Sequence, residues 1–150
     1  MTVPASSVPA VKAALMTKIA TQVADSSVLI SYDVPGTFQP DDIIVVGDVE
    51  RTASPVAMIG SGQAGFMHED YTVQITVSVF RGGDIAQTAF ERAYALNDAV
   101  ETAVRNDMTL GVARVLTAKP TRTLEQSRWD DSHLGRLVSV LTIITVKATL

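Results

Sequence analysis

The stretch Glu69–Gly83, EDYTVQITVSVFRGG, decides the fold class of this 150-residue chain. Apolar residues alternate with polar ones from Tyr71 to Val79, which is the pattern of a strand with one buried and one polar face. Such a strand is too long for one small helix to cover. Its polar face has neither lysine nor glutamate, so we expect another protein surface to cover it. The residues of this polar face are Thr72, Gln74, Thr76 and Ser78.

Upstream of this strand, the sequence predicts an amphipathic helix over residues 8–24, because apolar residues recur there at three- and four-residue steps. Ser6 or Ser7 is its predicted cap, and Pro9 is tolerated in the first turn, where backbone amides have no helical partner. Residues 1–7 form a short polar lead-in that we expect to be flexible.

A second, longer helix follows the strand and ends near Arg105. Asp84 and Gln87 have the spacing of a capping box, in which each side chain satisfies a free amide at the helix start. Alanines on the inward face would allow close approach to a sheet. The predicted inward residues are Ala86, Ala89, Phe90, Ala93, Asn97, Val100 and Val104.

Further strands are predicted from alternation and from turn residues between apolar runs. Pro55 restricts its strand to a sheet edge or a bulge, and Pro120 is expected to interrupt the chain. The last strand is apolar on both faces, which is typical of a central or covered strand. The seven predicted strands cover residues 28–34, 42–49, 51–59, 68–80, 112–117, 123–129 and 136–148.

The resulting order α-β-β-β-β-α-β-β-β does not alternate regularly between helices and strands. It predicts one α+β domain over residues 1–150, with a mainly antiparallel twisted sheet and two helices packed on one face.

Composition excludes several classes of function. The net charge is −4 and the 12 lysines and arginines are scattered, which argues against a dedicated nucleic-acid-binding surface. The absence of cysteine excludes disulfides, cysteine nucleophiles and thiolate metal sites. We expect no signal peptide, since the N-terminus lacks a basic region followed by an apolar core. We expect no membrane helix, since the apolar runs fall short of ~18 residues. A hydrophobic fraction of 47% argues against disorder, and the positive mean hydropathy of +0.24 favours burial of further surface in an oligomer.

Four polar motifs were weighed as chemical sites. His68-Glu69-Asp70 could begin a metal site, but a solvated strand entrance or an interface salt bridge is the favoured interpretation. Gly60-x-Gly62-x-x-Gly65 joins two strands, so it lacks the strand-to-helix context of a phosphate loop and is interpreted as a hairpin tip. Asp41-Asp42 and Asp130-Asp131 are interpreted as turn formers.

No triad or metal set is apparent, so we expect no enzyme activity, no cofactor and no metal. Trp129 either anchors an interface or closes one end of the sheet.

The order of elements resembles that of the tail terminator (tail completion) proteins of long-tailed bacteriophages. The resemblance spans most of the chain. It is carried by the helix through Val11-Lys12-Ala13-Ala14-Leu15, the strand end Met58-Ile59-Gly60, the alternation over residues 69–77, the helix Arg92–Val104 with Asp107-x-x-Leu110-Gly111, and the strand that begins Gly135-Arg136-Leu137.

The resemblance implies a structural protein that forms a ring, typically a hexamer, on the end of the tail tube. Its partners would be further copies of itself, the tail tube protein and the head-side connector or stopper. Genomic DNA would pass through the lumen without sequence-specific binding, and no membrane would be involved. The protein would lie in the tail or neck of the virion after assembly in the host cytoplasm.

Two alternatives remain open. One is another neck or tail component of phage, such as a head–tail connector or a tube subunit. The other is an unrelated α+β ligand-binding oligomer.

The predicted contacts to neighbouring subunits or to the tube lie in the hairpin, on the polar face of the long strand and at the tryptophan. They are Ser61, Gly62, Gln63, Ala64, Phe66, Met67, Thr72, Gln74, Thr76, Ser78 and Trp129.

Overall fold

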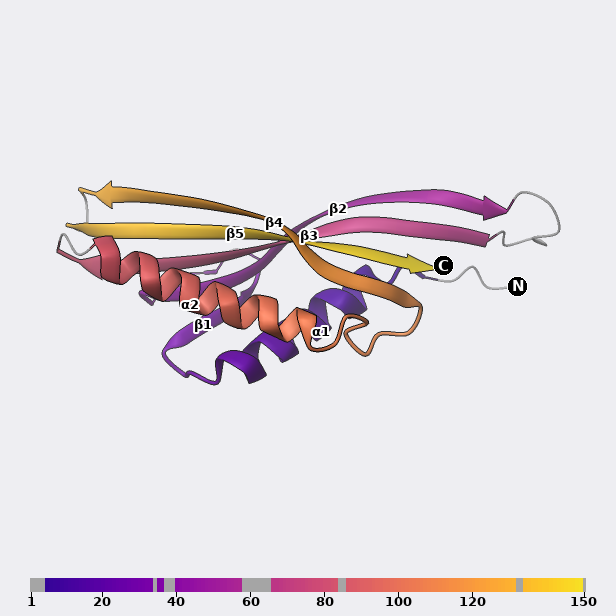
Figure 1. The fold of residues 1–150 in the computed structure, drawn as a ribbon, viewed down its shortest axis with the longest axis horizontal. Helices are drawn as coiled ribbons and strands as arrows, with labels where there is room; N and C mark the ends of the chain where they lie inside the picture. Colours follow the sequence, from indigo (N-terminus) through magenta and orange to yellow (C-terminus); the bar gives the residue numbers. More distant parts are fainter. Residues whose placement is uncertain are drawn as a thin grey trace.

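A computed structural model describes residues 5–33, 35–36, 40–57, 66–83, 86–131 and 134–149. It is an elongated molecule with one long twisted sheet and two helices (Figure 1). In chain order the elements are α1 (Val8–Val23), β1 (Val28–Tyr32), β2 (Asp42–Ala57), β3 (Phe66–Gly82), α2 (Ala86–Arg105), β4 (Val115–Asp130) and β5 (Gly135–Thr149).

The sheet has the strand order β1-β2-β3-β5-β4. β1 pairs with β2 in parallel, and all other neighbours are antiparallel. The predicted α+β class and mainly antiparallel sheet are therefore confirmed. β5 lies between β3 and β4, in agreement with its two apolar faces.

Two pairs of predicted strands are continuous in the structure. β2 joins predicted segment 42–49 to residues 51–57 of the next segment, whose last two residues lie outside the described part of the chain. β4 joins residues 115–117 to segment 123–129, and residues 112–114, predicted as strand, form a turn before it. Pro120 therefore does not interrupt the chain. Pro55 of β2 and Pro120 of β4 each lie beside a register shift, on a stretch of strand that has a partner strand on one side only. The missing amide donor of proline therefore interrupts no row of hydrogen bonds.

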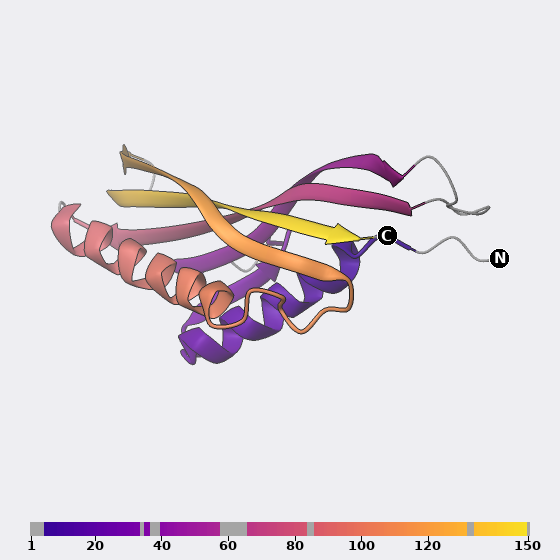
Figure 2. The same ribbon diagram turned by 45° about the vertical axis from the view of Figure 1, so that its right-hand side comes forward.

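Both helices lie along one side of the sheet (Figures 1 and 2), as expected. α1 buries Val11, Leu15 and Ile19 in the core, on the predicted stripe. No helix among the described residues is long and apolar enough to cross a membrane.

The inward face of α2 was predicted correctly except at its first turns. Ala86 is exposed, and Phe90 is 41% exposed and stacks on Tyr94 with 4.8 Å between ring centroids. Leu96 is buried instead. The helix therefore presents alanine to the sheet at Ala89 and Ala93, and its large aromatic side chains flank the contact. The predicted N-cap Asp84 lies outside the described residues.

Candidate assembly interface

The side of the sheet away from α1 and α2, here called the outer face, carries the polar residues of the long strand. Strand alternation places Thr72, Gln74, Thr76 and Ser78 there, and all four are half-buried. The opposite side chains of β3, from Tyr71 to Val79, are buried against the helices. The expected division into a buried and an uncovered face is thus present, whereas contact with a partner remains a prediction.

Apolar side chains of neighbouring strands surround this polar row. Ile43 and Val45 of β2 lie opposite Ser78 and Thr76, and Leu137 of β5 lies opposite Phe80. All of these except Thr76 line a shallow hollow of about 490 Å³, with Arg128 and Asp130 also in its lining. Leu141, Ile143 and the 45%-exposed Leu124 continue the apolar surface across β5 and β4. The centre of the outer face, along β3 and β5, is therefore weakly polar and uncharged, and charged side chains such as Arg128 and Asp130 lie at its edge.

The other predicted contact residues either lie outside the described residues or lie on the helix-bearing side. Ser61–Ala64 lie outside the described residues, as does the side chain of Phe66. Met67 is half-buried and shares the helix-bearing side of β3 with Glu69. Trp129 also lies on that side, opposite Arg136, whose guanidinium carbon is 5.9 Å from the centre of the indole ring. The structure thus brings four of the eleven predicted residues onto the outer face.

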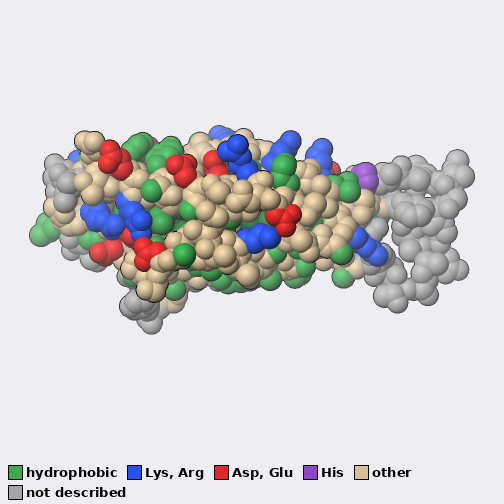
Figure 3. Space-filling model, turned by 60° about the horizontal axis from the view of Figure 1, so that its bottom comes forward, with side chains coloured by type: hydrophobic (Ala, Val, Ile, Leu, Met, Phe, Trp, Pro, Cys, Tyr) green, Lys and Arg blue, Asp and Glu red, His purple; other side chains and the backbone are tan. Residues whose placement is uncertain are grey.

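The helix-bearing side of the molecule carries charges of both signs. Lys and Arg side chains occur there together with Asp and Glu, and neither sign forms a continuous block (Figure 3). Two ion-pair clusters, centred on Glu69 and Asp42, account for the buried charge in the part of the chain that the structure describes, apart from Lys12, which pairs with Asp33.

Glu69 is fully buried and binds four groups from two other parts of the chain. Its carboxylate accepts hydrogen bonds from Ser6 Oγ (2.7 Å), from the Ser7 amide (2.7 Å) and hydroxyl (2.5 Å), and from Arg51 Nε (2.6 Å). Burial acts to raise the pKa of Glu69, but the bonds from Ser7, Arg51 and Ser6 outweigh it and lower the pKa to about 2. The interpretation of Glu69 as part of a solvated strand entrance was therefore wrong.

The same cluster fixes the start of α1. Ser7 holds the N-cap position without a side-chain cap bond, because its hydroxyl contacts Glu69 and the Tyr71 hydroxyl (2.9 Å). Ser6 Oγ instead accepts the Val8 amide at 3.2 Å. Burial of Tyr71 raises the pKa of its phenol to about 12. The N-terminal serines thus attach α1 to the end of β3.

Asp42, interpreted from the sequence as a turn former, is instead the buried first residue of β2. It accepts two bonds from Arg81, at 2.6 and 3.1 Å, and one from Arg92 Nε at 3.1 Å. Burial acts to raise the pKa of Asp42, but the two arginines hold it below its ordinary value. Arg92 also binds Asp25 at 3.0 Å, so this cluster joins β2, β3, α2 and the turn after α1.

These contacts explain architecture and offer no obvious chemistry. No group of three His, Asp or Glu side chains suited to a metal ion occurs among the described residues. Every buried side-chain nitrogen or oxygen there has a hydrogen-bond partner. Groups that satisfy one another in this way are positioned for stability.

The comparisons with known proteins give a fold match and no sequence match. No family model matches the chain, and no curated protein matches its sequence. Among solved structures, a chain of the "virion of native gene transfer agent (GTA) particle" superposes with a TM-score of 0.54. The alignment covers 97% of this chain and 100% of the other, at 18% identity. The two chains share a fold.

Proposed function

We propose that this chain is a structural virion protein of a phage or phage-like particle and has no enzymatic role. The observation that carries the proposal is the fold match, over nearly the whole of both chains, to a component of a gene transfer agent virion. The uncovered outer face supports it, because a sheet face with an uncharged centre suits burial against another subunit.

Within that class we propose the role of a tail terminator. Copies of the chain form a ring, a hexamer in the family it resembles, that caps the tail tube and ends its polymerisation. The opposite side of the ring joins the head-side connector or stopper. A ring built by one repeated contact needs two different surfaces on each subunit, and an elongated molecule with an uncovered sheet offers them. The protein would then belong to the tail or neck of the virion, after assembly in the host cytoplasm.

The charge of the chain fits passage of DNA through such a ring. With a net charge of −4, a lumen lined by this protein would repel phosphate and let the genome slide without sticking. Replacing lumenal Asp or Glu by Lys is expected to slow DNA ejection, because each new cation adds a phosphate contact. Ejection at the unchanged rate would contradict this part of the proposal.

The decisive experiment combines native mass, measured across a concentration series, with negative-stain images and purified tail tubes. We expect a closed ring with a central hole, or a monomer that assembles on tube ends and stops further growth. The proposal would be refuted if the protein stays monomeric and binds neither tail tubes nor connectors.

A tube subunit is the alternative, because the matched chain is described only as part of a virion. The same experiment separates the two roles. A terminator binds at tube ends and blocks extension, whereas a tube subunit extends the tube along its length.

A further inference from the structure

Two strands of the sheet have long edges without a partner strand. β1 covers only Asp42–Val46 of β2, so residues 47–57 have no neighbouring strand on that side within the described structure. β4 is last in the strand order. The amide of Ala118 in its first part bonds the Met108 carbonyl, but residues 121–129 are all exposed. Unpaired strand edges readily accept a further strand.

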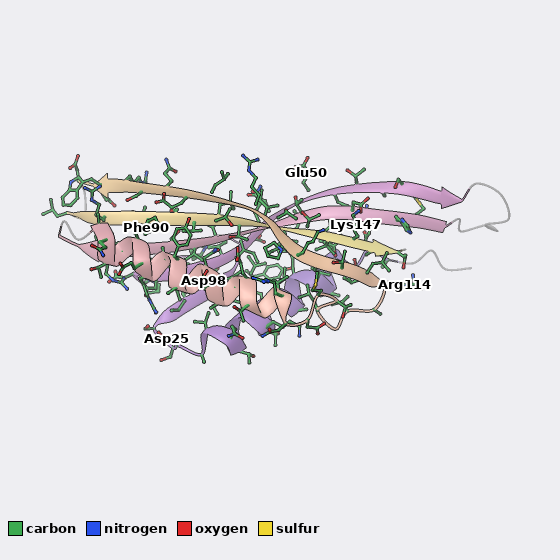
Figure 4. The ribbon with its side chains drawn as sticks, viewed as in Figure 1. Asp25, Glu50, Phe90, Asp98, Arg114 and Lys147 are labelled. Carbon is green, nitrogen blue, oxygen red and sulfur yellow. The ribbon has the colours of Figure 1, made fainter. Side chains whose placement is uncertain are left out.

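On the outer face, the free part of β2 carries two acidic residues, and the free part of β4 carries two arginines together with Asp130. Glu50 of β2 lies opposite Thr72 and points away from the helices (Figure 4), and Asp48 lines a hollow with Gln74 and Thr76. On β4, Arg122 and Arg128 lie on the outer face, opposite Ile143 and Leu137.

In the part of the chain that the structure describes, these four charged residues form no ion pair. Like charges on both edges would keep copies apart, as in proteins that protect their edges. Here the outer-face charges of the two free edges are opposite in net sign, which favours the approach of one copy to the next.

Strand directions allow the two edges to pair. β2, β3, β5 and β4 are successively antiparallel, so β4 runs opposite to β2 within one subunit. In a ring with cyclic symmetry, β4 of one copy therefore meets β2 of the next in the antiparallel sense. The free part of β4 pairs with the start of β5, and the free part of β2 pairs with the start of β3, so the two lie toward opposite ends of the sheet. Adjacent copies must then be staggered, as in any closed barrel with tilted strands.

We propose that residues 121–130 of β4 in one copy pair with residues 47–57 of β2 in the next, so that the sheet continues from subunit to subunit. In the register that sets Arg128 opposite Asp48, Glu50 lies diagonally across from Arg128, and Arg122 lies opposite Ser54. The contact is heterologous, and its repetition closes a ring when the rotation between neighbouring copies divides a full turn evenly. The inference rests on the proposed function for the ring itself, and it adds which surfaces form it.

Charge reversal on each edge separately tests the pairing. The acidic-edge variant is Asp48→Lys/Glu50→Lys, and the basic-edge variant is Arg122→Glu/Arg128→Glu. Each alone places like charges in every contact and is expected to sediment as a monomer at concentrations where the wild type is a ring. A 1:1 mixture restores opposite charges at every contact and is expected to restore assembly, with the two variants alternating. Glu91→Lys/Asp98→Lys makes the same charge change on the exposed side of α2 and should assemble normally.

The outcomes separate this inference from the proposed function. Rings from both single-edge variants, or no assembly in their mixture, would overturn the edge pairing and leave a ring terminator possible. The pairing is also overturned if the wild type stays monomeric in solution and the edge variants assemble on tail tubes as well as the wild type does. In that case, binding of the wild type to tube ends still tests the proposed function.

Hydrogen exchange gives a second readout on the wild type alone, should a variant fail to fold. Amides in residues 47–54 and 121–129 are expected to become protected on assembly. Unchanged exchange at both edges in an assembled ring would contradict the inference.

Discussion

At the scale of single residues, the feature with most consequence is the buried carboxylate of Glu69. It joins β3 to Arg51 of β2 and to the two serines before α1, so three distant segments depend on one charge. Removing a buried charge that is this fully hydrogen-bonded leaves its donors unsatisfied, which costs more than the net value of the bonds themselves.

The lowered pKa of Glu69 predicts acid sensitivity. Because the folded-state pKa of about 2 lies below the ordinary value of 4.5, the group stabilises the folded protein fully above about pH 4.5. That contribution, roughly 3 kcal/mol, is lost as the pH falls from about 4.5 to about 2. Urea unfolding of the wild type and Glu69→Gln at several pH values would measure it.

We expect Glu69→Gln to be less stable at pH 7 and to lose less stability on acidification. Parallel pH profiles for the two proteins would show that another carboxylate dominates the acid response.

The sequence contained a signal for this residue. Glu69 is in phase with Tyr71 and Val73, on the face that becomes buried. A charge in that phase indicates a buried, paired group. Its partners could not be predicted, because Arg51 and the serines reach it only through β2 pairing and the packing of α1.

At the scale of elements, the tight contact between β3 and β5 ends at Gly82 and Gly135. A Cβ placed on Gly135 would meet the Arg81 carbonyl oxygen and, at 2.5 Å, the ring of Phe80. The glycine is therefore required by a close approach of two strands.

Gly135→Ala is expected to destabilise the fold by about 1–3 kcal/mol, since the backbone or the Phe80 ring must shift. Gly82→Ala is the matched control, because a Cβ at Gly82 meets nothing within 4 Å. Thermal or urea denaturation of the two variants would check the difference. Equal stability of the two variants would indicate that the backbone at the start of β5 can shift at little cost to make room for the added methyl group.

Element type was largely predictable, and element length was not. Periodicity identified both helices and the strands, because apolar spacing reports the buried face directly. Pro120 was misleading, since its effect depends on whether its strand is central or at an edge. Only the strand order, with β5 inserted before β4, places it at an edge. Phe90 was misplaced for a similar reason: periodicity allowed it inward, but close packing at Ala89 and Ala93 excluded it.

At the scale of the whole molecule, the outer face is the surface that a monomer leaves uncovered. The sequence indicated it through the uncharged polar residues of β3. It could not indicate the separation of charge between β2 and β4, because those strands become opposite edges only in the folded sheet.

Placing negative charge at the centre of this face is expected to prevent assembly. Gln74→Glu/Thr76→Glu would place two carboxylates under whatever surface covers this face, where their desolvation is costly, while changing side chains that are only half-buried. The expected result is a folded monomer, measured by circular dichroism and sedimentation. Gln87→Glu/Thr88→Glu, on the exposed start of α2, is the control and should still assemble. An intact ring in the first variant would show that the centre of the outer face lies outside the contact.

The insertion of β5 between β3 and β4 also constrains how the chain is made. During translation β3 emerges long before its second partner, and β4 emerges with no strand to pair with until β5 follows. The nascent chain therefore cannot complete its sheet on the ribosome until the segment containing Val138–Ala148 has left the exit tunnel. A subunit whose surfaces bind its own copies would, in this way, become competent to associate only after its synthesis has passed that point.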